Sequence, residues 1–226
     1  MPEDPGPADH RRVTAARRRA AMRDKLLEAT MVVFTQEGRG RPVIEDVVRQ
    51  AEVSRTTFYK HFDSLEEAFV LVGQQLSDQF TVDILRVYDV LGEPWQRFAV
   101  GFRVFLMRAM LDKRWAGFIT RMDVWPHHSL VAHYMTQDIR RGIERQQFTV
   151  ANAEAAADFL MGAAAGCINA LRNGVADPQA QIDLSVQMGL ASLGCTPPRC
   201  AEGMRFARRH LSEWGAEYGA PDTPRP

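Results

Sequence analysis

The sequence predicts an all-α protein, with an N-terminal three-helix helix-turn-helix unit followed by a larger helical domain. Apolar residues recur at i, i+3 or i+4, and i+7 along most of the chain, which is the spacing of one helix face. The alternation of β-branched and polar residues that marks strands is missing, while Ala, Leu, Arg, Gln and Glu are plentiful. The length, 226 residues, suits one large domain or two smaller ones.

Both ends of the chain are predicted to be flexible. The first ten residues contain three prolines and lead into the arginine-rich segment "HRRVTAARRR", so residues 1–19 are expected to form a flexible basic arm. Residues 216–226 are expected to form a flexible tail, because "GAPDTPRP" is rich in proline and polar residues.

Two amphipathic helices follow the arm. The first is expected from roughly Ala20 to Glu37, with Gly38 as its stop. Its apolar stripe consists of Leu26, Thr30, Val33 and Phe34. The second helix is short and ends near "AEVS". Its stripe consists of Ile44, Val47, Val48 and Ala51.

The stretch "SRTTFYKHF", residues 54–62, predicts a third helix with two different faces. The Ser54 hydroxyl can cap its first turn. Phe58 and Phe62 share one face at i, i+4, which we expect to pack inward. A helix of about 100° per residue then places Thr56 and Lys60 on the outer side. Two short helices joined by a tight turn behind a longer helix form a helix-turn-helix, whose third helix enters the major groove of DNA.

The charge distribution agrees with a nucleic-acid partner. Lys+Arg and Asp+Glu both number 28, so the chain as a whole is neutral. Residues 10–62, however, hold 12 Lys+Arg against 6 Asp+Glu. The neutral total therefore conceals a basic N-terminal third.

The segment "VIEDVVRQAEVSRTTFYKHFDSLEEAF" resembles the DNA-binding domain of the TetR family of transcriptional regulators, and the match covers residues 23–70. Its most specific parts are "LLEATMVVFTQEG", "VVRQAEVSRTTFYKHF" and "DSLEEAF". The resemblance implies base or nearby backbone contacts by the first turn of the third helix and phosphate contacts further along it. The predicted DNA-binding residues are Ser54, Arg55, Thr56, Thr57, Tyr59, Lys60 and His61.

The sequence departs from the family pattern at three places. Glu52 stands where the turn usually has glycine, and a left-handed conformation there costs a residue with a side chain about 1 kcal/mol. Pro42 and Val43 replace a pair of threonines, and Leu65 replaces a common lysine. Phosphate contacts are therefore expected to be fewer. The arginine-rich arm either offsets them by contacting the minor groove or backbone, or is a solvated helix extension.

The larger domain is expected to begin with a long helix from Ser64 to near Val90. Ser64 and Glu67 form a capping box at its start. The predicted helix-turn-helix domain covers residues 20–66, and the helical ligand-binding and dimerisation domain covers residues 67–215.

Aromatic residues gather after Trp95 at helical spacing. Each one alone is best explained as core, but so many in a small helical domain also favour an apolar cavity. The predicted cavity residues are Phe98, Phe102, Trp115, Phe118, Met122, Trp125, His128 and Tyr134. The cluster His127, His128 and His133 lacks the i, i+4 spacing of a helical zinc site, so no metal or cofactor is expected.

Small residues on the later helices predict a homodimer interface, with packing inside one chain as the alternative. Small side chains on one face allow another helix to approach closely, and the last two long helices form a four-helix bundle across a two-fold axis in the resembled family. The predicted interface residues are Gly162, Ala163, Gly166, Ala170, Val186 and Gly189.

These patterns favour a ligand-responsive, homodimeric DNA-binding regulator, with repressor as the family majority. Its expected partners are a palindromic double-stranded DNA operator and a small apolar or aromatic effector. An enzyme has no support, since phosphate-binding glycine loops, HExxH and a nucleophile elbow are missing. A ligand-binding or chaperone-partner protein that has lost DNA binding stays open as the alternative.

No membrane insertion is expected, because no run of eighteen apolar residues occurs. A reducing cytoplasm is the expected location, because the three cysteines are an odd number and form no closely spaced pair. Cys167, Cys195 and Cys200 are most simply semi-buried free thiols, with a thiol sensor as the alternative.

Overall fold

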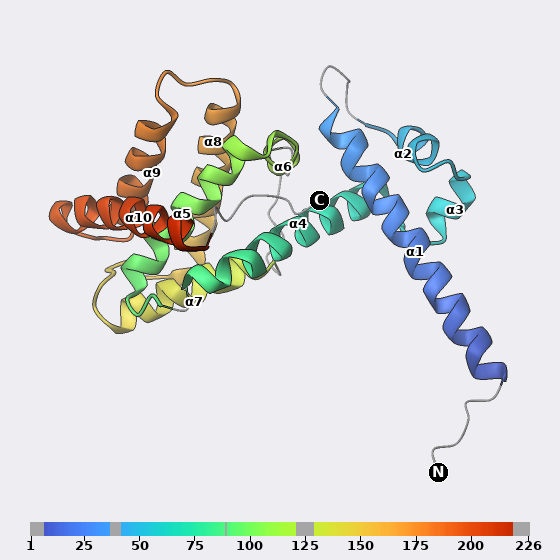
Figure 1. Ribbon diagram of the computed structural model, residues 1–226, viewed down its shortest axis with the longest axis horizontal. Helices are drawn as coiled ribbons and strands as arrows, with labels where there is room; N and C mark the ends of the chain where they lie inside the picture. The colour runs from blue at the N-terminus through green and yellow to red at the C-terminus, as the bar shows by residue number, and fades with distance from the viewer. Residues whose placement is uncertain (1–6, 37–41, 89, 121–128, 219–226) are drawn as a thin grey trace, which may run out of the picture. The chain divides into compact units, whose positions relative to one another are not determined.

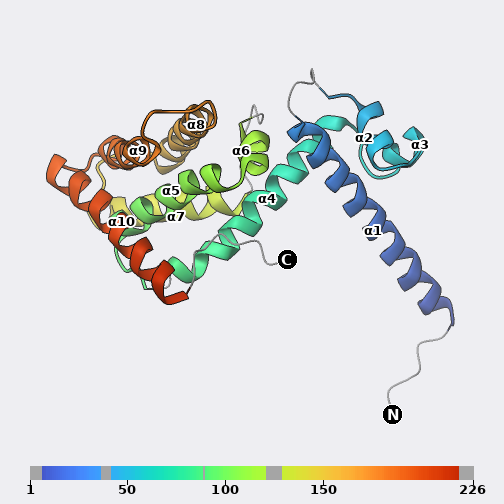
Figure 2. The same cartoon turned by 45° about the horizontal axis from the view of Figure 1, so that its top comes forward.

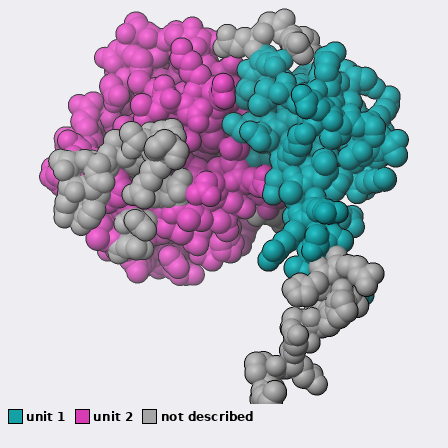
Figure 3. Space-filling view, turned by 45° about the vertical axis from the view of Figure 1, so that its right-hand side comes forward, with its two compact units in different colours: residues 1–72 teal, residues 73–226 magenta. Residues whose placement is uncertain are grey.

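The protein is described here by a computed structural model that covers residues 7–36, 42–88, 90–120 and 129–218 (Figure 1). Within these ranges the chain forms ten α-helices and no strand, as the sequence predicts. The chain divides into two compact units, Met1–Val72 and Gly73–Pro226 (Figure 3). The division falls inside α4 (Leu65–Tyr88), a few residues beyond the predicted boundary at residue 66.

Unit 1 contains α1 (Pro7–Thr35), α2 (Ile44–Gln50), α3 (Arg55–Tyr59) and the first turns of α4. Its core holds the inward-facing residues that the sequence predicts for these helices. The buried members are Leu26, Thr30, Val33, Val47, Ala51, Phe58 and Phe62. The ring of Phe34 stacks on that of Phe69 with centroids 4.3 Å apart, which packs α1 against α4.

The prediction of a flexible arm up to residue 19 needs correction, because α1 begins at Pro7. Proline suits the first position of a helix, since its fixed φ and missing N–H cost nothing there. Alanine and arginine, which dominate the residues that follow, are strong helix formers. At the other end of the chain, α10 reaches Tyr218. This helix therefore includes the first residues of the predicted tail.

The helix-turn-helix forms around local signals in the sequence. The Ser54 hydroxyl accepts a hydrogen bond from the Thr57 amide at 3.1 Å and caps α3 as predicted. Glu52 adopts φ of 52°, the left-handed conformation inferred for this turn. Val43 has no hydroxyl to cap α2, and its own amide donates to the Asp46 carboxylate at 3.2 Å.

Unit 2 is a bundle arranged around α5 (Pro94–Leu111), which packs against five other helices (Figures 1 and 2). These are α6 (Lys113–Ile119), α7 (Leu130–Glu144), α8 (Ala153–Arg172), α9 (Pro178–Ser192) and α10 (Pro197–Tyr218). Four of the helices in this unit begin at a side chain that accepts a hydrogen bond from the third helical amide. These caps are Asp112, Ser129, Asn152 and Asp177.

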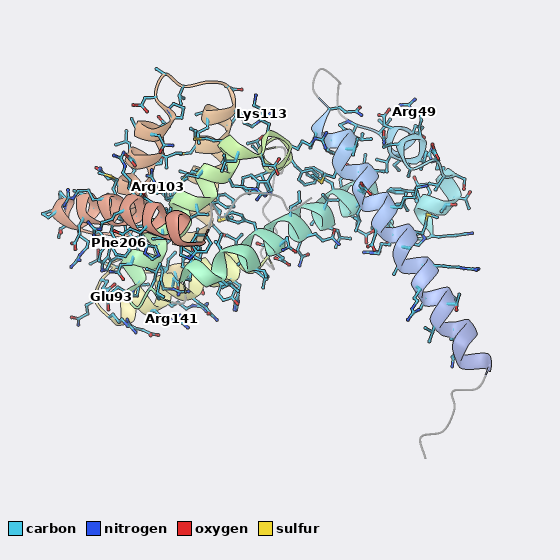
Figure 4. All side chains as sticks on the ribbon, in the orientation of Figure 1. Arg49, Glu93, Arg103, Lys113, Arg141 and Phe206 are labelled. Atoms are coloured by element: carbon cyan, nitrogen blue, oxygen red, sulfur yellow. The ribbon has the colours of Figure 1, made fainter. Side chains whose placement is uncertain are left out.

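A buried ionic network ties α5 to α9 and α10. Arg103, labelled in Figure 4, has a side chain that is only 4% exposed. Its guanidinium pairs with the Asp183 carboxylate and donates to Gln179 at 2.9 Å. Arg208 pairs with the other oxygen of Asp183. Burial, and then the charge of Arg208, lower the pKa of Arg103. The Asp183 carboxylate therefore stabilises the buried positive charge of Arg103.

Asp183→Ala is expected to lower the free energy of unfolding by about 3–5 kcal/mol, because it leaves a buried guanidinium without its counter-ion. Glu154→Ala is a matched control, since it breaks an ion pair with Arg140 in which both side chains are exposed. The control should leave the unfolding midpoint nearly unchanged. Urea denaturation followed by circular dichroism measures both variants, and equal effects would contradict the assignment.

Candidate functional site

The outer face of α3 presents the side chains that the sequence predicts to contact DNA. Arg55, Thr56, Tyr59 and Lys60 are exposed, whereas Phe58 between them is buried. The other three predicted residues also lie on this surface, with Ser54 exposed and Thr57 and His61 partly exposed. The seven residues therefore form one continuous surface, here called the α3 face.

Arg55 is held within the α3 face by its neighbours. Its guanidinium pairs with the Glu45 carboxylate at 2.6 Å and lies 5.7 Å from the centre of the Tyr59 ring. The hydrogen bond to the Tyr59 hydroxyl, and then the charge of Glu45, raise the pKa of Arg55. A base or phosphate contact by Arg55 must therefore compete with the carboxylate of Glu45 on α2.

Arg23 of α1 anchors the far end of the α3 face, which the sequence analysis did not anticipate. Its guanidinium donates to the carbonyl of His61 at 2.9 Å and lies 4.6 Å above the Phe62 ring. Burial, and then the charges of Arg19, Arg23 and Lys60, lower the pKa of His61. A lowered pKa favours the neutral imidazole near pH 7, so His61 offers a hydrogen bond rather than a positive charge.

A cavity of about 50 Å³ lies within unit 2 between α4, α5, α7 and α8. Most of its wall is apolar and aromatic. The lining residues are Phe80, Thr81, Ile84, Tyr88, Arg97, Phe98, Gly101, Phe102, Phe105, Val131, Tyr134, Met135, Asp138 and Met161. An aromatic wall with a few polar groups is the usual composition of a small-molecule site.

Three of the predicted cavity residues, Phe98, Phe102 and Tyr134, line this cavity. Trp115 and Phe118 do not, and their prediction is corrected: both are fully buried in the core, with Trp115 against the rings of Phe80 and Phe105. The remaining three predicted residues lie outside the described residues. They are Met122, Trp125 and His128.

A partly buried ion pair forms the polar part of the cavity. The Arg97 guanidinium contacts the Asp138 carboxylate at 2.8 Å, donates to the Tyr88 carbonyl at 3.2 Å and lies 4.7 Å from the centre of the Tyr88 ring. Burial raises the pKa of Asp138, and the hydrogen bond and charge of Arg97 oppose this rise. Burial also raises the pKa of Tyr88, so its hydroxyl stays protonated.

Several of these lining residues were missed although a signal for them exists. Phe80, Ile84 and Tyr88 occupy i, i+4 and i+8 of α4, which is one helix face. The sequence analysis assigns no cavity residue to this helix. Arg97 and Asp138 are far apart in the sequence, and no pattern in either segment predicts that they meet.

The predicted dimer residues separate into two groups. Gly162 and Gly166 of α8 are exposed, and a side chain added at either would meet open space. Ala163 and Ala170 are half-buried beside them on the same helix. The interface prediction is corrected for α9, where Val186 and Gly189 are buried in the core.

Gly189 has a clear role within the single chain. A Cβ at this position would lie 2.7 Å from the Phe98 ring, so the glycine allows α9 to approach α5 closely. The outward side of α9 instead presents Leu184 and Met188, which are 53% and 64% exposed. Phe159 on α8 is 63% exposed.

These outward residues lie on the exposed sides of two helices that pack against each other, and we group them as one candidate surface. We call it the α8–α9 face, and it consists of Phe159, Gly162, Gly166, Leu184 and Met188. Three large apolar side chains exposed on adjacent helices are typical of a surface that another protein covers.

The described part of the chain was compared with two further kinds of site, a metal centre and a membrane-spanning helix. No group of three potential metal ligands comes together there. None of the helices in the same ranges is both long enough and apolar enough to cross a membrane. Burial raises the pKa of the Cys195 thiol to about 11 and also raises that of Cys200, which makes both poor nucleophiles.

Profiles of two protein families match the chain over most of its length. The profile described as bacterial regulatory proteins of the tetR family matches residues 26–70, which contain the α3 face. The profile described as the tetracyclin repressor-like C-terminal domain matches residues 93–203, which contain most of the cavity and the α8–α9 face. No curated protein matches the sequence.

Solved structures with the same fold include RolR in complex with resorcinol, at 20% identity and a TM-score of 0.69, covering 86% of this chain and 96% of that chain. A putative TetR-family regulator from Syntrophomonas wolfei is 16% identical, with a TM-score of 0.58, and covers 75% and 93% of the two chains. An ArpA-like gamma-butyrolactone receptor is 11% identical, with a TM-score of 0.54 and coverages of 86% and 99%. These identities establish a shared fold only.

Proposed function

The chain belongs to the TetR family of transcriptional regulators, and from this premise we propose that it is a homodimeric repressor released from a palindromic DNA operator by a small aromatic molecule. The observation that carries the proposal is the α3 face, where a capped helix exposes polar and basic side chains above buried Phe58 and Phe62. Such a surface is suited to the major groove. The protein's proposed place of action is the cytoplasm.

The α3 face divides its contacts between bases and phosphates. Thr56, at the exposed start of α3, is placed to read base edges, since recognition helices lead with their N-terminal residues. Lys60 follows α3 at its C-terminal end and supplies a positive charge to the phosphates. Arg55 joins the readout by leaving Glu45, so the free protein keeps this arginine ordered until DNA replaces the carboxylate.

The cavity in unit 2 is the proposed effector site. Its stacked Phe98 and Phe102 rings, 5.3 Å apart, suit an aromatic ring, and Arg97, Asp138 and Tyr88 suit a hydroxyl substituent. RolR, whose solved complex contains resorcinol, supports this chemistry by analogy of fold. The proposed effector is therefore a small phenol.

The size of the cavity supplies a mechanism for release. Its volume is about 50 Å³, whereas a cavity that holds benzene measures roughly 150 Å³. A phenol must therefore push the walls apart. One wall is α4, which contributes Phe80, Ile84 and Tyr88 and begins among the residues of unit 1. A ligand that prefers the widened state shifts the protein away from the DNA-binding state.

Dimerisation is proposed through the α8–α9 face. A two-fold axis would bring Gly162 and Gly166 against the same face of a second copy and cover Phe159, Leu184 and Met188. Two copies are needed because each α3 face covers only a half-site, and the half-sites lie about one DNA turn or a multiple of it apart.

The first prediction concerns sequence readout. Thr56→Ala should change which bases are preferred, whereas Lys60→Ala should weaken binding to all sequences and reduce the salt dependence by about one phosphate contact. Arg199→Ala in unit 2 removes the same charge as Lys60→Ala and should leave DNA binding unchanged. Fluorescence anisotropy with operators selected from random duplexes measures this. Wild-type binding by both α3 variants would remove the α3 face from the interface.

The second prediction concerns the dimer. Gly166→Leu adds a side chain into open space in the single chain, so folding should be preserved while the partner helix is displaced at a cost of roughly 1–3 kcal/mol. Met188→Glu should also favour the monomer. Val82→Glu, at a 52% exposed valine on α4, is its matched control. Analytical ultracentrifugation gives the dissociation constants, and an unaltered dimer in both α8–α9 variants would refute the assignment.

The third prediction concerns the effector. Resorcinol and related phenols should bind with a coupling to DNA of about 1–3 kcal/mol, seen as weaker binding in the presence of operator. Phe102→Ala should weaken phenol binding because it removes a cavity wall. Phe206→Ala, on α10 and outside the cavity lining, is the matched control. Isothermal titration measures both, and full phenol affinity after Phe102→Ala would place the site elsewhere.

A further inference from the structure

The N-terminal part of α1 carries a series of arginines, most of which lie beyond the helix-turn-helix core. The core of unit 1 begins at Leu26, and residues 12–20 are all exposed. Residues 11–23 contain six arginines and no acidic residue. In Figures 1 and 2 this part of α1 projects beyond α3, away from α2.

The geometry of the helix selects three of these arginines. At about 100° per residue, Arg12, Arg19 and Arg23 lie within roughly 40° of one another, whereas Arg17 and Arg18 point more than about 100° away from them. We call Arg12, Arg19 and Arg23 the arginine row. A rise of about 1.5 Å per residue makes the row roughly 16 Å long.

The inner end of the row is fixed against α3. Arg23 donates to the carbonyl of His61 at 2.9 Å and covers the Phe62 ring. The charge of Arg19 reaches His61 as well, since it contributes to the lowered pKa of that residue. The row therefore lies on the side of α1 from which α3 projects, which is the side that approaches the duplex when α3 enters a groove.

We propose that the arginine row binds the phosphate backbone of DNA just outside the half-site that α3 reads. This inference rests on the proposed DNA-binding function and extends its interface. A row of cations without a carboxylate between them is complementary to a duplex, which carries one negative charge per roughly 1.7 Å of its axis.

The helical state of α1 makes this contact efficient. A flexible arm would lose conformational entropy when it settles on DNA. The row is instead held along a continuous helix from Pro7 to Thr35. The row also compensates for phosphate contacts that are missing elsewhere, because Val43 has no hydroxyl and Leu65 is buried.

The contact is independent of base sequence. Guanidinium groups that meet phosphates fix the register and orientation of a protein on the duplex but do not read bases. The row should therefore set affinity, salt dependence and the length of DNA covered, while the α3 face sets sequence preference.

Two double variants test the proposal with equal loss of charge. Arg12→Ala/Arg19→Ala removes two members of the row, and Arg17→Ala/Arg18→Ala removes two arginines on the other side. Alanine is the strongest helix former, so both variants should keep α1 helical, which circular dichroism checks. Binding to a selected operator with flanking base pairs is measured by fluorescence anisotropy over a range of KCl concentrations.

The row variant should lower the slope of log K against log salt by up to about 1.8, which corresponds to two phosphate contacts, and should weaken all sequences equally. Its hydroxyl-radical footprint should lose the outermost protected positions. On a duplex trimmed to the half-sites alone, the row variant should bind as the wild type does. The control double variant should keep the wild-type slope and footprint.

Equal losses in the two double variants would overturn the proposal, because they would show an effect of net charge rather than of a positioned row. Unchanged binding by the row variant would show that the arginines are only solvated. In both cases the wild type still binds its operator, so the proposed function survives. A wild type that binds no duplex at all would instead remove the proposed function and this inference with it.

Discussion

A buried guanidinium must keep a carboxylate partner, and this constraint on α5 organises unit 2. Arg97 and Arg103 both point from α5 into the bundle, where Asp138 of α7 and Asp183 of α9 meet them. Arg103 is buried, so leaving it unpaired in a low-dielectric interior would cost several kcal/mol, whereas the partly buried Arg97 would lose less. The two pairs therefore fix α7 and α9 on the surface of α5.

The two ion pairs have different consequences for function. The Arg97 pair lies at the cavity, so the group that holds α7 in place is also the most polar part of the proposed effector site. A phenolic hydroxyl that engages Asp138 would compete with this structural contact. The Arg103 pair lies away from the cavity lining and holds the inward side of α9, which leaves Leu184 and Met188 to face outward.

Unit 1 follows a different principle, because its working surface is supported by apolar packing and by local hydrogen bonds. Phe58 and Phe62 anchor α3 from below, and the Ser54 cap sets its first turn. The left-handed backbone of Glu52 is strained, and it lies in the turn that orients this short helix. Charged side chains contribute at the edge of this surface, where Glu45 pairs with Arg55 and Arg23 covers the Phe62 ring.

The sequence alone determined the all-helical fold and most of the helix-turn-helix, because the signals for both are local. A cap, an i, i+4 pair of phenylalanines and a residue in a glycine position act within a few residues of one another, as Ser54, Phe58, Phe62 and Glu52 do. The helical extent of α1 was missed, since prolines near the start outweighed the strong helix propensity of the alanines and arginines that follow.

Only the tertiary structure decided which side of each helix in unit 2 forms the core, lines the cavity or faces outward. Periodicity marks an apolar face but does not say whether a cavity, the core or a second chain covers it. Phe102 therefore reached the cavity while Trp115 and Phe118 became core, and Gly166 stayed exposed while Gly189 closed against Phe98. The meeting of Arg97 with Asp138 depends on the packing of α5 against α7, a contact between segments 41 residues apart that no local pattern encodes.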